Sequence, residues 1–164
     1  MASRSVLVTD TNIWIDLENG GILADVFTLS YRLLIPDFAI LELIHPNWET
    51  LHGLGLEAIE LMGEQVIELP HLSQLHKSLS ITDLAAFLLA KTLKAILLTG
   101  DWRLNELAIA NGLTTHGVLW LLDDMVYFQV LTPGRAATAL IRMLEQGARL
   151  PEDECYRRLS NWSE

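Results

Sequence analysis

The stretch SVLVTDTN at residues 5–12 decides the fold of this chain. A run rich in β-branched and apolar side chains stops at Asp10, Thr11 and Asn12, residue types that favour a turn leading into a helix. A short apolar run that ends in this way predicts a buried strand. We therefore expect Asp10 at the carboxyl end of a strand inside a sheet.

A second stretch, AILLTGD at residues 95–101, has the same form, with Thr99 and Asp101 just beyond an apolar run. Further strands are predicted at residues 32–35, 66–69 and 113–116. Helices are predicted at residues 13–17, 22–29, 38–44, 48–62, 84–93, 102–110 and 118–126, with Asp37 as the cap of the third. Alternating strands and helices predict an α/β fold, a three-layer α/β/α sandwich with a mainly parallel central sheet.

The end of the chain is predicted to be helical, at residues 133–144 and 151–159. Pro133 and Gly134 form the only seam in the pattern, so we divide the chain into an α/β domain at residues 1–132 and a helical C-terminal extension of that domain at residues 133–164. Three arginines of this extension, Arg135, Arg142 and Arg149, recur every seven residues. Such spacing would place them on one helix face, which we interpret as a solvated face rather than as a nucleic-acid contact.

Composition indicates a compact cytoplasmic protein. The chain has 164 residues, 51% hydrophobic and 20% charged, with a single cysteine, Cys155, and no apolar run of membrane-spanning length. One cysteine excludes an internal disulfide framework and fits a reducing compartment. The net charge of −10 counts against non-specific attraction to nucleic acid, because phosphate binding is driven largely by lysine and arginine.

Four acidic residues are candidates for chemistry. Asp10 and Asp101 follow strands, and ligand sites in parallel sheets gather at the carboxyl ends of strands. Glu42 interrupts an otherwise apolar helix, where a bound cation would compensate a buried carboxylate. Asp83 opens the strongest predicted helix. Each acid also has an ordinary interpretation: Asp10, Asp83 and Asp101 as helix caps, and Glu42 as an ion-paired or exposed residue.

In this order, the elements VTDTN around Asp10, Glu42 within an apolar helix, Asp83 opening an Ala/Leu-rich helix, and LLTGD ending at Asp101 resemble the PIN domain family. The resemblance covers about residues 6–118. It implies that the four acids gather around Mg²⁺ or Mn²⁺ to hydrolyse RNA phosphodiester bonds. It also implies that Asn12 and Thr99 hold ligands or water by hydrogen bonds.

Many bacterial and archaeal PIN domains are the ribonuclease toxins of toxin–antitoxin pairs, so the resemblance implies RNA as substrate, an antitoxin protein as partner, and a homodimer. Arg103, beside Asp101, is the best single candidate for a phosphate contact. The alternative function is a non-catalytic PIN-like module that binds a protein or RNA, which the acidic surface and the bulky Trp102 favour. An unrelated α/β domain would leave Glu42 away from the other acids.

Overall fold

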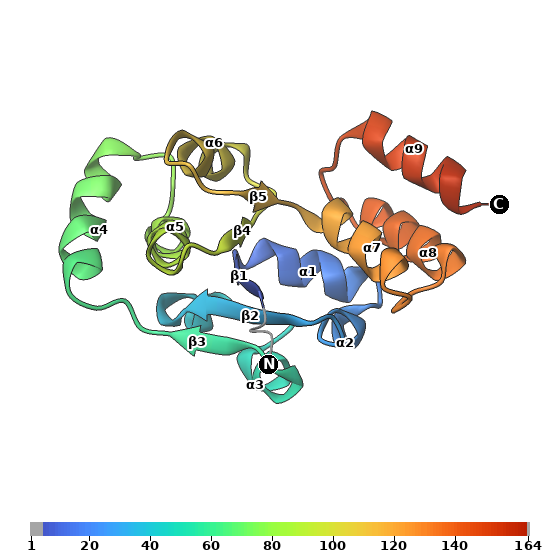
Figure 1. Cartoon of the computed structure of the whole chain (residues 1–164), viewed down its shortest axis with the longest axis horizontal. Helices are drawn as coiled ribbons and strands as arrows, with labels where there is room; N and C mark the ends of the chain where they lie inside the picture. Colours follow the sequence, from blue (N-terminus) through green and yellow to red (C-terminus); the bar gives the residue numbers. More distant parts are fainter. Residues whose placement is uncertain (1–4, 164) are drawn as a thin grey trace.

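The computed structural model describes residues 5–163, and a parallel sheet of five strands lies at the centre of this part (Figure 1). The strands are β1 (Ser5–Thr9), β2 (Tyr31–Pro36), β3 (Glu57–Ile59), β4 (Ile96–Leu98) and β5 (Thr115–His116), in the order β3-β2-β1-β4-β5. All four pairings are parallel, and β1 lies in the middle between β2 and β4. The carboxyl ends of all five strands therefore share one edge.

Helices cover both faces of the sheet and complete three layers, which confirms the predicted fold class. One hydrophobic cluster joins the sheet to α4 (Glu64–Leu75), α5 (Ile81–Leu93) and α6 (Trp102–Ala110). The other joins it to α1 (Asn12–Asn19), α2 (Leu23–Val26), α3 (Trp48–Leu54), α7 (Val118–Tyr127), α8 (Pro133–Glu145) and α9 (Glu152–Trp162). Figure 1 shows α4, α5 and α6 at one end of the molecule and α7, α8 and α9 at the other.

Alternation along the strands places neighbouring side chains in opposite cores. Leu7 belongs to the cluster with α1 and α8, whereas Val8 belongs to the cluster with α5. Leu98 and Leu97 divide between the two clusters in the same way. Because both faces are covered, the central strands are continuous apolar runs, as is typical of parallel sheets.

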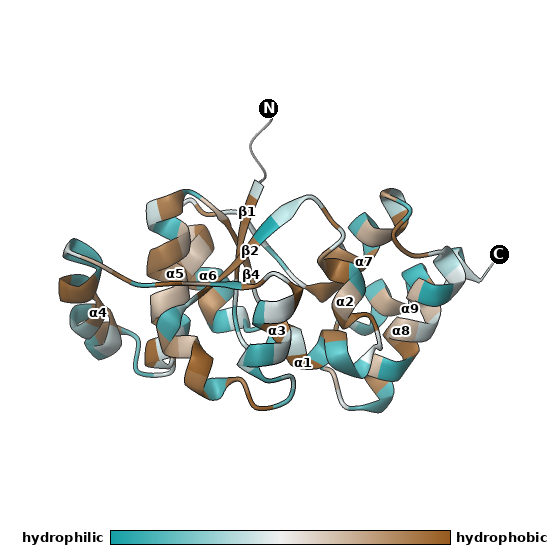
Figure 2. Cartoon of the chain, turned by 90° about the horizontal axis from the view of Figure 1, so that it is seen from below, coloured by the Kyte–Doolittle hydropathy of each residue, from teal (hydrophilic) through white to brown (hydrophobic). Residues whose placement is uncertain are grey.

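The C-terminal helices pack on the α1 side of the sheet. Thr132 caps α8 by accepting a hydrogen bond from Arg135 N, and the buried face of α8 includes Ala139 and Met143. Arg158 of α9 forms an ion pair with Asp123 of α7 at 2.7 Å. Colouring by hydropathy in Figure 2 shows α5 largely hydrophobic, whereas α9 exposes hydrophilic residues.

Two predicted elements between β2 and α5 are wrong. The helix predicted at residues 48–62 ends at Leu54, because Gly55 adopts a positive φ of 127° that stops a helix, and residues 57–59 then form β3. The strand predicted at residues 66–69 is part of α4, which continues through Pro70. A short apolar run does not by itself distinguish a strand from a helix.

The α-helix predicted at residues 38–44 is also wrong, because the chain there forms a 3₁₀ helix, η1 (Asp37–Glu42). Asp37 makes no capping hydrogen bond, and Pro36 occupies the cap position.

None of the helices within residues 5–163 combines the length and the apolar character that a membrane span requires.

Candidate active site

Asp10 lies at the junction of the two central strands. Its backbone N–H donates to the Leu98 carbonyl at 3.1 Å, so it continues the pairing of β1 with β4. The Thr99 hydroxyl donates to Asp10 Oδ2 at 2.5 Å, and the Ile13 N–H donates to Oδ1 at 3.1 Å. A short hydrogen bond from a hydroxyl to a carboxylate is among the stronger kinds. Both oxygens of Asp10 are thereby held in one orientation.

Burial makes this carboxylate unusual. Asp10 is only 5% exposed, and loss of solvation raises its pKa from the ordinary 3.8 to about 6. The hydrogen bonds from Thr99 and from the backbone of Ile13 and Gly100 lower the pKa, while the negative charge of Asp83 raises it. The fold therefore holds a carboxylate in a place that disfavours its negative charge.

Asp101 is connected to Asp10 through Thr99. The Thr99 hydroxyl accepts a hydrogen bond from the Asp101 N–H at 3.0 Å while it donates to Asp10. The Asp101 side chain caps α6, accepting from Arg103 N at 2.8 Å and Leu104 N at 3.3 Å. Asp101 is thus a helix cap, and it lies at the same edge of the sheet as Asp10.

Glu42 reaches this edge from η1, which follows β2. The Thr82 hydroxyl donates to Glu42 Oε1 at 2.7 Å, and the Thr11 hydroxyl is 3.4 Å from Oε2. These two hydroxyls are next in sequence to Asp83 and Asp10, so Glu42 lies close to both. Sequence reasoning missed Thr11 and Thr82, although the adjacency of each to a candidate acid was a usable signal.

The surroundings of Glu42 correct one expectation. The residue was expected in an apolar helix, either buried beside a cation or exposed, and it is exposed, as are Phe38 and Leu41 of η1, whereas Ala39 is buried. Leu41 is 90% exposed and Phe38 is 45% exposed. An apolar sequence pattern therefore does not by itself indicate burial in η1. No compensating cation is needed to explain Glu42 alone.

Asp83 comes to the site because α5 runs opposite to the strands. A helix that precedes a parallel strand begins at the carboxyl edge of the sheet, where the strands end. Ser80 and Asp83 form a capping box, in which Asp83 N donates to Ser80 Oγ at 3.0 Å and Ser80 N donates to Asp83 Oδ2 at 3.1 Å. Asp83 is therefore part of a cap, and its charge also reaches Asp10.

The two residues predicted to support the acids, Thr99 and Asn12, differ in burial and in hydrogen bonding. Thr99 is buried and bridges Asp10 and Asp101, as described above. Asn12 is the first residue of α1, and its exposed side chain makes no hydrogen bond within residues 5–163. A residue missed from the sequence is Thr9, whose buried hydroxyl accepts a hydrogen bond from Trp14 Nε1 at 2.9 Å. This contact fixes α1 against the end of β1.

A comparison with protein families agrees with this geometry. A family model described as a PIN domain matches residues 6–164. The chain belongs to the PIN domain family. Comparison with curated proteins and with solved structures finds no match for this PIN domain.

The acids of this PIN domain fit a hard divalent ion in their chemistry but do not converge on one. Use of a divalent metal is general in PIN domains, and carboxylate oxygens are the donors that Mg²⁺ and Mn²⁺ prefer. Among residues 5–163, no three acidic, histidine or cysteine side chains stand together as a ready metal site. Asp83 and Asp101 each give one carboxylate oxygen to a helix cap, and the other oxygen of each makes no hydrogen bond within residues 5–163.

An exposed aromatic and a cation stand beside the acids of the PIN domain. Trp102 follows Asp101 and is 63% exposed, and the Arg103 guanidinium lies 5.4 Å from the centre of its ring. Arg103 forms no ion pair with any carboxylate of the described residues. Next to Glu42, a cavity of about 330 Å³ is lined mainly by apolar residues, including Ile15 and Ile44.

Proposed function

We propose that this PIN domain is a metal-dependent endoribonuclease that hydrolyses RNA phosphodiester bonds. The observation that carries the proposal is Asp10, a buried carboxylate fixed at the β1–β4 junction while three other acids reach the same edge. Burying an uncompensated charge costs folding free energy. Strongly shifted carboxylates of this kind cluster at functional sites, and a cation at this edge would offset the cost.

Each residue has a definite task in this proposal. Asp10, Glu42, Asp83 and Asp101 would hold a Mg²⁺ or Mn²⁺ ion, which would polarise the phosphate as a Lewis acid and lower the pKa of a bound water. Thr99 keeps Asp10 in one orientation and places the start of α6. Thr82 and Thr11 restrain the otherwise exposed Glu42. Proper positioning of such groups accounts for much of the rate gain in phosphoryl transfer.

RNA binding must overcome the acidic surface of the chain. Arg103 is free to contact a phosphate, and Trp102 presents a ring on which a base can stack. Both residues directly follow Asp101, which supports the expectation that they contact RNA near the acids. With a net charge of −10, non-specific binding elsewhere on the surface is expected to be weak.

The test is cleavage of a fluorescent RNA by the purified protein with and without Mn²⁺. We expect Mn²⁺-dependent cleavage that falls at least about 100-fold in Asp10→Asn and in Asp101→Asn, because each removes a charged ligand. Glu60→Gln is the matched control, since Glu60 is an exposed carboxylate outside the site. Equal cleavage by wild type and Asp10→Asn would show a contaminating nuclease and contradict the proposal.

A second candidate function, a module that binds a protein partner, is favoured by the apolar surface beside Glu42. Phe38, Leu41 and Ile44 are all exposed there, and large exposed apolar patches mark interaction sites. A partner seated on this surface would also cover Glu42, which is how an antitoxin would restrain a toxin.

The toxin role predicts growth arrest on expression of wild type but not of Asp10→Asn. Normal growth in both cases would leave the toxin role without support.

A homodimer is also part of the proposal. Light scattering on the purified protein measures the mass directly against the 18.4 kDa of one chain. A mass of one chain at micromolar concentration would contradict this expectation.

A further inference from the structure

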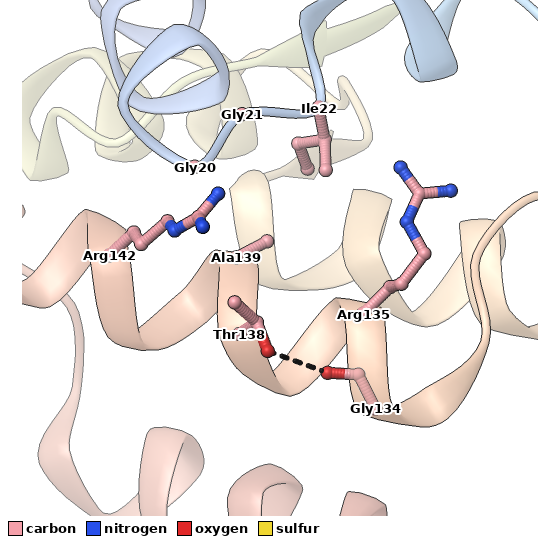
Figure 3. Close-up of a pocket in the computed structure, with 8 residues that line it drawn as sticks. All are labelled: Gly20, Gly21, Ile22, Gly134, Arg135, Thr138, Ala139 and Arg142. Atoms are coloured by element: carbon pink, nitrogen blue, oxygen red, sulfur yellow. Dashed lines mark hydrogen bonds between the residues drawn. The ribbon is translucent and has the colours of Figure 1, made fainter.

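A pocket lined by arginines lies away from the acids, between the end of α1 and the face of α8 (Figure 3). Its volume is about 280 Å³. Helix α1 begins beside Asp10 and ends at Asn19, so the pocket is about 12 Å along the helix from the candidate active site. The lining residues are Gly20, Gly21, Ile22, Gly134, Arg135, Thr138, Ala139 and Arg142.

Small residues create this space. Gly20 and Gly21 end α1, and a Cβ at Gly20 would stand 2.7 Å from Met143 Cε. A Cβ at Gly21 would meet the Arg142 guanidinium at 3.0 Å, and the φ of Gly21 is +73°. The chain therefore approaches α8 closely only with glycine at these positions. The pocket lies beside this close contact, and Arg142 reaches it from α8.

The two arginines stand two helical turns apart on the same helix, one at each end of the pocket. Figure 3 shows the Arg142 guanidinium directed toward Gly20 and that of Arg135 rising beside Ile22. Arg142 forms no ion pair or hydrogen bond through its side chain within residues 5–163, whereas Arg135 is 3.2 Å from Asp25.

The charge of this pocket is opposite to that of the protein. Its eight lining residues include two arginines and no acid, in a chain of net charge −10. The Gly20 and Gly21 N–H groups are already bonded to the Asp16 and Glu18 carbonyls. The donors facing the pocket are therefore guanidinium groups, which bind oxyanions through paired hydrogen bonds.

We propose that this pocket binds the phosphate group of a small phosphate ester. The volume of about 280 Å³ lies just below the range for drug-sized ligands, about 300–1,000 Å³, so it suits a phosphate with little attached. Arg142 supplies a guanidinium without an ion pair among the described residues. Arg135 supplies the second guanidinium, which also forms an ion pair with Asp25. The site is separate from the acids, and the proposal does not depend on nuclease activity.

The test is isothermal calorimetry in EDTA at low salt, with inorganic phosphate, adenosine monophosphate and a 5′-phosphorylated RNA trinucleotide as probes. Arg142→Gln removes the free guanidinium, and Arg149→Gln is the matched control, because Arg149 lies beyond the end of α8 and outside the pocket. Thr138→Phe keeps both arginines but fills the pocket, and its position on the exposed surface keeps the fold intact. Circular dichroism checks folding of each variant.

We expect saturable binding of at least one probe by wild type and Arg149→Gln, weakened about 10-fold to 100-fold in Arg142→Gln and also weakened in Thr138→Phe. The tightest probe identifies the source: free phosphate, a nucleotide, or the end of an RNA chain. A lack of saturable binding by any probe overturns the proposal. So does equal affinity in wild type and Arg142→Gln, or equal loss in Arg142→Gln and Arg149→Gln.

Discussion

Replacing Asp10 with asparagine is expected to make the metal-free protein more stable at neutral pH. Asparagine keeps an oxygen for the Ile13 N–H and an amide that can donate to Thr99, while it removes the charge. The folded-state pKa of about 6, against 3.8 when unfolded, means that the unfolded chain holds its negative charge more easily. Ionising Asp10 therefore costs folding about 3 kcal/mol at pH 7.

The pH dependence fixes the sign of this effect. Because the folded pKa is raised, the cost is fully present above pH 6 and disappears as the pH falls through the window from about 6 to 3.8. The advantage of Asp10→Asn over wild type is expected to be about 3 kcal/mol at pH 7, about half of that at pH 5, and under about 1 kcal/mol at pH 4.

The assay is urea unfolding of both proteins in EDTA at these three pH values, followed by circular dichroism. Thermal unfolding at pH 7 should show a midpoint higher by about 6–12 °C, given about 2–4 °C per kcal/mol for a chain of this size. Glu60→Gln, an exposed carboxylate-to-amide change, controls for the general effect of lowering the net charge. Asp10→Asn that is less stable than wild type at pH 7 would refute the reasoning about burial.

Three further outcomes are expected from urea unfolding or hydrogen exchange. Ser80→Ala removes the cap of α5 and should lower the free energy of unfolding by about 1 kcal/mol. Ser78→Ala is the neutral control, because Ser78 is exposed and lies outside the cap. Equal losses of stability in the two variants would contradict the role of the cap. Trp14→Phe leaves the buried Thr9 hydroxyl without its donor and should cost about 1–3 kcal/mol, so an unchanged stability would contradict that bond. Arg158→Gln removes the ion pair with Asp123 and should speed amide exchange in α9 while β1 is unaffected; unchanged exchange in α9 would show that apolar packing alone holds the helix.

The positions in the fold that were predicted correctly are those with a local signal. Asp10 and Asp101 each follow a run of buried strand residues, and the end of such a run can be read directly from the chain. The strand at residues 57–59 was not predicted, because it is a three-residue edge strand whose side chains are only partly buried. Weak burial leaves little alternation to recognise.

The rest of the site depends on contacts between distant residues. The Thr82 hydroxyl meets Glu42 across 40 residues of chain, and no local pattern reports such a contact. Exposure of Glu42 could not be inferred either, because it depends on which elements fail to cover η1. The sequence named Asp83 as a candidate beside the other acids, but only the fold shows why it reaches this edge, because a helix runs opposite to the strands that it connects.

The central position of β1 determines when the candidate site can exist during synthesis. Asp10 leaves the ribosome before its partner Thr99, which follows 89 residues later, and β1 lacks one neighbour until β4 has been made. A growing chain therefore carries its first acid without the hydroxyl that orients it. If the domain cleaves RNA, a nascent chain still attached to its messenger and ribosome would be inactive until translation has passed Asp101.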